Sequence, residues 1–375
     1  MRITVLHNHP IHYKHLLFTA LAGLGAEVDV IFAARSSNLR TASLQPSGED
    51  YKSHFLWDGC FESLPQIRTA LRAVGIVRRC HSDVVIISGY SYLPTWFVLA
   101  WAKLSRKPIV LWFESNQFDR PRHRMLEQVK RIFIGACDHG HVYGKSNRYY
   151  LEKLGMKPAA IIEKRATVDY HMFTQRRAAF HTDYRRFVYV GRFSPEKNLP
   201  RLLEAFHMVR DQRRAELVLV GYGPEEQMLR QKTCALGMED SVVFAGAKTQ
   251  DEVCMALAES DCLVLPSLSE PWGLVVNEAL CAGLPIIVSD RCGCSLDLVT
   301  EDTGWTFKAE DTEELADRMR EVCGLSLERL HEMGEATIAI AADYAPEACA
   351  KRILANLQEL VDRRRSLKGL VNGHA

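Results

Sequence analysis

Short apolar runs alternate with amphipathic segments along most of the chain. In the segment 199–210, residues such as Leu199, Leu202 and Phe206 recur at the spacing of one helical face. The runs between such segments are rich in Val, Ile and Leu, which predicts buried strands. Strands that alternate with helices indicate parallel sheets with right-handed crossovers. The predicted strands are 3–6, 28–31, 84–87, 109–111 and 141–143 in the first half, and 187–190, 217–220, 242–244, 262–265 and 286–288 in the second.

Two such sets of strands predict an α/β protein with two Rossmann-like domains. The length agrees, because 375 residues exceed what one core ordinarily holds. We expect a first domain over 1–170 and a second over 171–345, with the polar, basic stretch 174–186 as linker. Residues 346–375 are predicted to form a helix that packs back on the first domain. Ligands of such folds bind beyond the carboxyl ends of the strands, so the expected site is the cleft between the domains.

One uncharged stretch, 84–102, approaches the length of a membrane-spanning helix. Ser88, Gly89 and Pro94 interrupt it, so a buried strand followed by a loop and a helix is the better interpretation. The chain begins directly with a predicted strand and shows no signal-peptide core. Its eleven cysteines contain no C-x-x-C pair, which favours reduced thiols. We therefore expect a cytoplasmic protein.

The net charge of +1 is the sum of two large and opposite charges on the two halves of the chain. Residues 1–170 carry a charge of +9 and residues 171–375 a charge of −8. The basic half favours an anionic membrane or a phosphorylated substrate as partner, and no motif supports nucleic acid. A group of basic side chains is the candidate patch for contact with a membrane. The alternative interpretation of these residues is a solvated face of the predicted helix 122–134. The residues of the patch are Arg120, Arg122, Arg124, Lys130 and Arg131.

The strongest motif runs from Glu270 to Glu278, directly after the predicted strand 262–265. Its proline and glycine predict a tight loop, and a helix begins at Leu274. The amides of Trp272, Gly273 and Leu274 are therefore expected at a helix N-terminus, which binds anions. Glu278 on that helix is placed to accept ribose hydroxyls. The alternative is an ordinary helix start with two solvated glutamates.

A second motif, from Gly191 to Asn198, follows the predicted strand 187–190. Gly191 allows the chain to turn close to a ligand. Arg192 and Lys197 then offer a planar fork and a point charge to phosphate oxygens. Two solvated cations are the alternative. A third turn marked by glycines, from Gly221 to Pro224, lies at the same end of the sheet.

Together these motifs resemble the retaining GT-B glycosyltransferases of family four, also called glycosyl transferases group 1. The resemblance is strong over 187–308 and weak over 1–170. The segment Pro10-Ile11-His12-Tyr13 is similar to one in exopolysaccharide-type members. The resemblance implies a GT-B architecture with two Rossmann-like domains. It also implies that Arg192 and Lys197 hold the donor diphosphate, that Glu278 holds the ribose, and that Glu270 lies against the donor sugar.

The first domain departs from the family pattern at two places. Asn8-His9-Pro10-Ile11 stands where many members have a glycine pair, and Glu114 stands where many have a histidine. Glu114 and His12 are candidate contacts of the donor or acceptor. The competing interpretation of Glu114 is a loop carboxylate paired with a local arginine. A metal site is not expected at the clustered histidines, which are His7, His9, His12 and His15, because no carboxylate completes it.

The function implied is transfer of a sugar from a UDP- or GDP-linked donor to an acceptor hydroxyl, with retention at the anomeric carbon. No cofactor is expected, and the lack of any Asp-x-Asp argues against the metal-dependent architecture. The acceptor is expected to be a sugar or a lipid-linked sugar of polysaccharide or glycoconjugate synthesis. The alternatives are a GT-B epimerase or phosphorylase, and a module that binds a nucleotide sugar without turnover.

Overall fold

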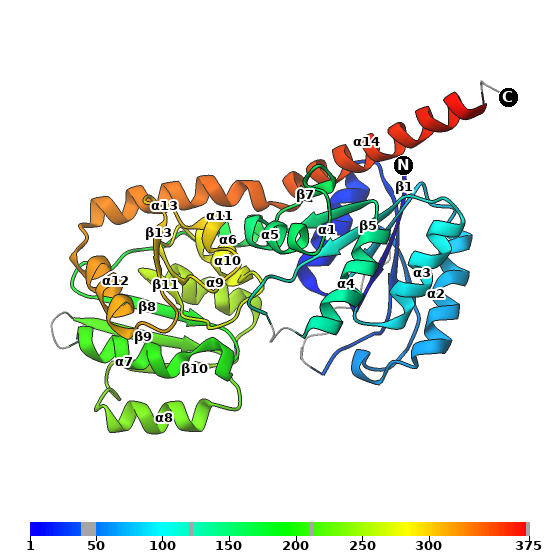
Figure 1. Ribbon diagram of the computed structural model, residues 1–375. Helices are drawn as coiled ribbons and strands as arrows, with labels where there is room; N and C mark the ends of the chain where they lie inside the picture. The colour runs from blue at the N-terminus through cyan, green and yellow to red at the C-terminus, as the bar shows by residue number, and fades with distance from the viewer. Residues whose placement is uncertain (39–49, 120–122, 211–213, 373–375) are drawn as a thin grey trace.

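The computed structural model describes residues 1–38, 50–119, 123–210 and 214–372, which form two α/β domains (Figure 1). The first domain is built on seven parallel strands in the order β3-β2-β1-β4-β5-β6-β7. The predicted α/β fold with two parallel sheets is confirmed. The strands are β1 (Arg2–His7), β2 (Glu27–Phe32), β3 (Lys52–Phe55), β4 (Val84–Ser88), β5 (Ile109–Phe113), β6 (His139–Val142) and β7 (Ile161–Glu163).

Alternate side chains of these strands enter two different cores. Val30 and Ile86 pack with α1 (His12–Gly23) and α14 (Pro346–Asn372) on one face of the sheet. Ile31 and Ile87 pack on the opposite face, against the remaining helices of this domain. A strand buried on both faces reads as a continuous apolar run, which is why the sequence pattern found β4 and β5. The helices of the second face are α2 (Gln66–Cys80), α3 (Leu93–Leu104), α4 (Arg124–Ala136) and α5 (Lys145–Lys153).

The second domain has six parallel strands in the order β10-β9-β8-β11-β12-β13. They are β8 (Arg185–Val190), β9 (Ala215–Val220), β10 (Val242–Gly246), β11 (Cys262–Leu265), β12 (Ile286–Ser289) and β13 (Gly304–Phe307). The helices are α7 (Leu199–Arg210), α8 (Glu226–Ala235), α9 (Gln250–Ala258), α10 (Leu274–Cys281), α11 (Ser295–Leu298), α12 (Thr312–Gly324) and α13 (Leu327–Ala341). Short 3₁₀ turns occupy Phe61–Ser63, Pro158–Ala160, Pro195–Lys197 and Ala342–Tyr344.

The chain crosses between the sheets twice. The first crossing, after β7, includes α6 (Tyr170–Thr174) and the segment expected as a linker. That segment is bound to the second domain: the backbone amides of His181 and Arg186 both donate to the carboxylate of Asp261, at 2.7 and 2.6 Å. The end of the expected linker also forms the start of β8. The second crossing leads into α14, which runs along the first domain and packs on α1 (Figure 1).

The ten predicted strands are present, and three more were missed. The missed strands β3, β7 and β13 have only three or four residues and mixed composition, so they carry no clear apolar run. The uncharged stretch 84–102 forms β4 and α3, and Pro94 lies in the first turn of α3. No helix in the described ranges is long and apolar enough to cross a membrane.

Candidate active site

The loops that follow β8 and β9 pack backbone against backbone. Gly191 directly follows β8, and a Cβ atom on Gly221, after β9, would lie 1.9 Å from the Gly191 carbonyl oxygen. Only glycine fits at position 221 without moving this loop. The Tyr189 hydroxyl donates to the Arg192 carbonyl at 2.9 Å and fixes the same turn. The Arg192 side chain is exposed and has no hydrogen bond or ion pair to any described residue.

Lys197 and Glu270, which the sequence assigns to different partners, form an ion pair with each other. Lys197 ends a 3₁₀ turn after β8, and Glu270 lies in the loop after β11. The two loops are joined further by the Leu268 amide, which donates to the Glu196 carbonyl at 2.8 Å. Both side chains of the pair are largely buried, with 19% and 15% of their surface exposed. The turn thus holds one cation in an ion pair, Lys197, and one, Arg192, that forms no ion pair with a described residue and whose charge acts on Glu196 at longer range.

The start of α10 presents backbone amides. Gly273 adopts a φ of +97°, which a side chain disfavours, and turns the chain into the helix. The amides of Gly273 and Leu274 have no hydrogen-bond acceptor within the described residues. The Trp272 side chain is not available to a ligand: it is buried between Tyr143 and Tyr344, and its indole N–H donates to Asn277 at 2.7 Å. Free amides at a helix N-terminus favour an anion.

Glu278 lies on the second turn of α10 and is partly exposed. Its carboxylate has no hydrogen-bond donor in the described part of the chain. Desolvation, together with the negative charge of Asp169, raises the pKa of Glu278 to about 7. Asp169 caps α6 by accepting from the Met172 amide, and its other oxygen lies 3.3 Å from His12 Nε2 at the start of α1. His12 therefore lies beside Asp169, whose charge acts on Glu278 of the second domain.

Glu114 follows β5, and its partners are two lysines from distant segments of the chain. Lys14 of α1 forms a close ion pair with it, and Lys164, after β7, lies 3.7 Å away. The lysines lower the pKa of Glu114 well below its usual range. The competing interpretation, in which Glu114 pairs with a local arginine, is therefore wrong: the partners of Glu114 are lysines from distant segments. Glu114 is held in a charge cluster inside the first domain.

The lysines of this cluster are almost fully buried. Lys14 also donates to the Tyr143 hydroxyl at 3.2 Å, whereas Lys164 Nζ has no hydrogen-bond acceptor among the described residues. The Lys164 ammonium lies 3.9 Å from the centre of the Tyr143 ring. Burial and the charge of Lys14 lower the pKa of Lys164 well below its usual value.

Amide side chains join the two carboxyl edges, and the sequence gives no motif for them. The buried Asn116, after β5, donates to the Glu270 carbonyl at 2.8 Å. Asn147 of α5 donates to the Pro271 carbonyl at 3.4 Å, and the Ser269 hydroxyl donates to the Phe118 carbonyl at 3.0 Å. The loops of the two domains are therefore in direct contact at the site, where the sequence predicted only a cleft.

The other N-terminal histidines contact side chains of the first domain. His7 is buried with Nδ1 2.8 Å from the Ser88 hydroxyl, and burial lowers the pKa of His7 well below its usual value. His15 Nδ1 lies 3.1 Å from the Tyr51 hydroxyl, and the His9 ring packs at Phe61. In the described ranges, the groups of metal-ligating side chains include none of these histidines.

The expected basic patch is only partly a surface feature. Arg120 and Arg122 lie outside the described residues. Lys130 donates to Glu127 at 2.7 Å and to the Tyr150 hydroxyl at 2.8 Å, so its charge is engaged within the first domain. Arg124 and Arg131 are exposed on α4. Four exposed apolar side chains lie among them: Met125, Leu126, Val129 and Ile132.

Solved structures with the same arrangement define the class of fold. Sucrose-phosphate synthase from Thermosynechococcus elongatus superposes with a TM-score of 0.78 at 18% identity, covering 97% of this chain and all of that one. HepE from Anabaena in complex with UDP gives 0.74 at 16% identity and covers 96% of this chain and all of that one. The chain therefore has the GT-B fold that the sequence resemblance implies.

A family model matches the second domain. Residues 173–339 match the model of the family Glycosyl transferases group 1, as the motifs of this segment indicated. N-acetyl-alpha-D-glucosaminyl L-malate synthase of Bacillus anthracis is 35% identical over 40% of this chain and 38% of its own length. The putative colanic acid biosynthesis glycosyltransferase WcaL of Salmonella typhimurium is 25% identical over 56% of this chain and 54% of its own. The matches thus span about a third to a half of these relatives, and WcaL confirms the exopolysaccharide-type resemblance.

Proposed function

We propose that this protein is a retaining glycosyltransferase that uses a UDP- or GDP-linked sugar as donor. One observation carries the proposal. The unpaired Arg192, the Lys197–Glu270 pair and the free amides of Gly273 and Leu274 lie on loops at one edge of the second sheet. Two cations and a helix N-terminus are what a diphosphate requires. HepE, with the same fold, is known in complex with UDP, which supports a nucleotide diphosphate as ligand.

The chemical problem is the loss of a diphosphate whose negative charge grows as the glycosidic bond breaks. Arg192, Lys197 and the amides at the start of α10 stabilise that charge, and they are positioned before the reaction begins. In the proposed same-face mechanism, the departing phosphate oxygen accepts the proton of the acceptor hydroxyl. No protein general base and no metal ion are then required. Loop contacts such as Asn116 to Glu270 hold the domains together and exclude water from the donor.

The glutamates have separate roles in this proposal. Glu278 has no internal hydrogen-bond donor, so its oxygens are available to the hydroxyls of the ribose. Glu270 is oriented by Lys197 and lies in the loop beside the amides, where it contacts the donor sugar. His12, which lies beside Asp169 and belongs to the first domain, is placed on the acceptor side.

The acceptor is proposed to be a sugar or lipid-linked sugar at an anionic membrane surface. The supporting feature is α4, which begins shortly after the loop that contacts the second domain. Met125, Val129 and Ile132 form an exposed apolar stripe, and Arg124 and Arg131 flank it. A helix of this kind lies in the membrane interface, with basic residues contributing about 1 kcal/mol each near anionic lipid. None of the eleven cysteines forms a disulfide within the described residues, which agrees with a cytoplasmic location.

Donor turnover tests the function and separates it from its alternatives. The protein is incubated with UDP- and GDP-linked sugars, with and without candidate acceptors, and both the released nucleotide and the anomeric configuration of the product are measured. Transfer to an acceptor with retained configuration supports the proposal. Turnover without an acceptor indicates an epimerase or phosphorylase, and donor binding without turnover indicates a binding module. An inverted product contradicts the retaining mechanism.

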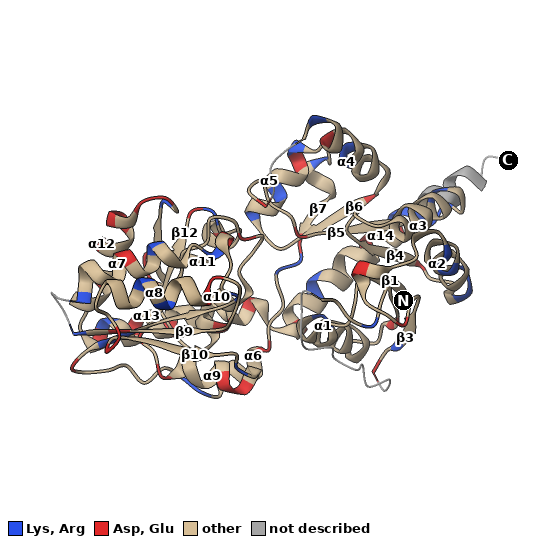
Figure 2. Cartoon of the chain, turned by 90° about the horizontal axis from the view of Figure 1, so that it is seen from below, with Lys and Arg blue, Asp and Glu red and all other residues tan. Residues whose placement is uncertain are grey.

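Vesicle sedimentation tests the membrane contact. Wild type is expected to bind anionic vesicles at low salt and to dissociate as salt increases, with little binding to neutral vesicles. Val129→Glu is expected to abolish binding. Leu71→Glu is the matched control, because Leu71 is exposed on α2, which carries four arginines at the far side of the first domain (Figure 2). Loss of binding in the Leu71 variant alone contradicts the assignment to α4.

A further inference from the structure

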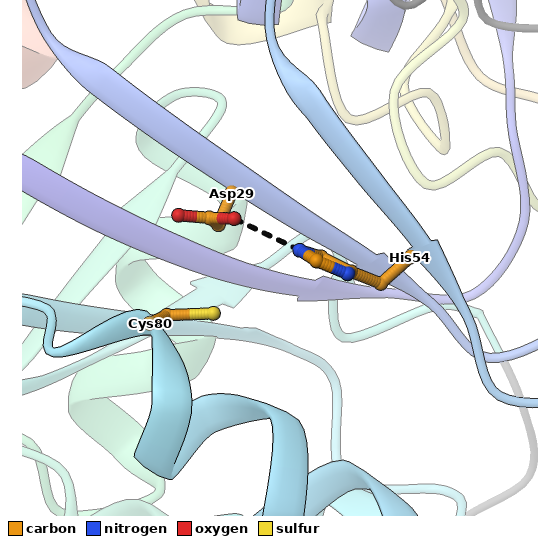
Figure 3. Close-up of side chains that lie close together, drawn as sticks. All are labelled: Asp29, His54 and Cys80. Carbon is orange, nitrogen blue, oxygen red and sulfur yellow. Dashed lines mark hydrogen bonds and ion pairs between the residues drawn. The ribbon is translucent and has the colours of Figure 1, made fainter.

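Three side chains with metal-ligating atoms meet on the first domain, away from the candidate active site. They are Asp29 of β2, His54 of the edge strand β3, and Cys80, the last residue of α2 (Figure 3). Strand register brings the first two together. His54 pairs with Ile31, so His54 and Asp29 lie on the same face of the sheet as Ile31. Ile31 faces α2, whose final turn places Cys80 against the pair.

The ligand atoms are close enough for one ion. His54 Nε2 lies 2.8 Å from Asp29 Oδ1, and one ligand atom from each of the three residues lies within 4.8 Å of the others. Tetrahedral zinc needs separations of roughly 3.3–3.6 Å, given bonds of about 2.0 Å to N or O and 2.3 Å to S. The Asp29–His54 contact must open by about 0.5 Å to reach these values, and any separation near the 4.8 Å limit must close by roughly 1.3 Å. With a third of its side chain exposed, His54 leaves room for a water as fourth ligand.

We propose that Asp29, His54 and Cys80 bind one Zn²⁺ ion. The donor set selects the ion, because thiolate and imidazole favour zinc, whereas Mg²⁺ and Ca²⁺ require oxygen ligands. Binding displaces the thiol proton of Cys80 to solvent and uses the neutral imidazole of His54. The carboxylate and the thiolate then balance the two positive charges of the ion. The Thr4 hydroxyl, which also contacts the Ser82 hydroxyl, is a polar neighbour of the sulfur.

The proposed site is structural. Cys80 precedes β4 by four residues, so the cluster lies toward the amino ends of the strands, whereas Glu114 and the contacts to the second domain lie at the carboxyl ends. A bound ion ties the edge strand β3 to β2 and to the end of α2. Zinc binding is therefore independent of the proposed metal-free transfer, and the two proposals fail separately.

Metal titration of the full chain tests the site. After treatment with a chelator, the protein is titrated with Zn²⁺ in competition with a chromophoric chelator, and with Co²⁺ as a spectroscopic probe. Wild type is expected to bind one tight equivalent, to show a thiolate-to-cobalt charge-transfer band, and to gain thermal stability with Zn²⁺. Cys80→Ser, His54→Gln and Asp29→Asn are each expected to weaken the affinity at least about 10- to 100-fold. Cys80→Ser also loses the charge-transfer band.

Cys234→Ser provides the matched control, because Cys234 is an exposed thiol in the second domain and the natural place for adventitious binding. It is expected to leave the tight equivalent intact. Asp29→Asn preserves a hydrogen bond to His54, so it tests the ligand without removing the pair. Absence of a tight equivalent in wild type overturns the proposal. So does equal affinity in wild type and the three ligand variants, or a loss of binding in Cys234→Ser alone.

Discussion

The carboxyl edges of the two sheets carry charge in opposite ways. In the first domain, the Glu114 carboxylate has two internal partners, Lys14 and Lys164, and both lysines are about 1% exposed. In the second domain, Arg192 is exposed without a partner, and Glu278 has no hydrogen-bond donor among the described residues. The same sheet edge is thus satisfied by the fold in one domain and left for a ligand in the other.

This difference separates structural charges from functional ones. A buried charge without a partner is costly, so a group with internal partners is explained by the fold itself. A charged group that the fold leaves without partners is either solvated or available to a ligand, and free helix amides favour an anionic ligand. By this criterion we expect Arg192 and Glu278 to bind a ligand and Glu114 to be structural. Lys197 and Glu270 are paired with each other, as structural charges are, although both lie on the loops of the proposed donor site.

The largest predicted effect is on stability, and it is expected to differ between substitutions of Lys14 and of Lys164. Lys14→Met removes the close partner of Glu114 and the donor to Tyr143, so it is expected to lower the free energy of unfolding by about 3–5 kcal/mol. Lys164→Met replaces a buried amino group that has no hydrogen-bond acceptor among the described residues and whose pKa is lowered well below its usual value, so it is expected to be neutral or stabilising. Urea denaturation of both variants measures this. Equal losses would contradict the expected difference.

The next effect concerns the exposed cation of the second domain. Arg192→Ala is expected to lower kcat/KM by about 2–4 kcal/mol, which is roughly 30- to 900-fold, because a preorganised charge donor is lost. Lys197→Ala is expected to cause a loss of the same size, and Lys197→Arg is not expected to restore kcat/KM fully, since a planar fork replaces a point charge. Arg230→Ala on α8, whose partner is Glu226, serves as control and should leave the kinetics unchanged. Near wild-type kinetics in Arg192→Ala would remove the assignment.

The sequence predicted the second domain better than the first for a physical reason. The motifs after β8 and β11 are local: glycines, cations and a helix start within nine residues of each other specify the loop almost by themselves. The cluster at Glu114 joins segments 100 and 50 residues away, and the Asn116 contact joins loops that are 154 residues apart in the chain. No local pattern encodes such contacts. The pairing of Lys197 with Glu270 escaped the sequence for the same reason.

The ion pair between Lys197 and Glu270 changes the effects that we expect from substituting Glu270 and Glu278. Glu270→Gln removes the charge that compensates Lys197, so the affinity for free nucleotide diphosphate is expected to increase several-fold while turnover falls. Glu278→Gln is expected to weaken the same affinity about tenfold, which corresponds to about 1.4 kcal/mol, because ribose hydroxyls lose an ionised acceptor. Calorimetry with UDP and GDP distinguishes the two. Weakening by both substitutions would show that Glu270 does not restrain Lys197.

The smallest effect is a pH dependence that isolates Glu278. Its pKa rises from an ordinary 4.5 to about 7, so the protonated form is favoured in the free protein. The resulting contribution to stability is full below pH 4.5 and is lost as the pH rises through 7. Nucleotide binding runs the other way, because the ribose needs the ionised carboxylate: affinity is expected to increase severalfold between pH 6 and about 8. The terminal phosphate of the nucleotide also titrates in this range, with a pKa of about 6. Glu278→Gln is therefore the necessary control. A variant that keeps the wild-type slope would assign the pH dependence to the ligand and leave Glu278 without a role in binding.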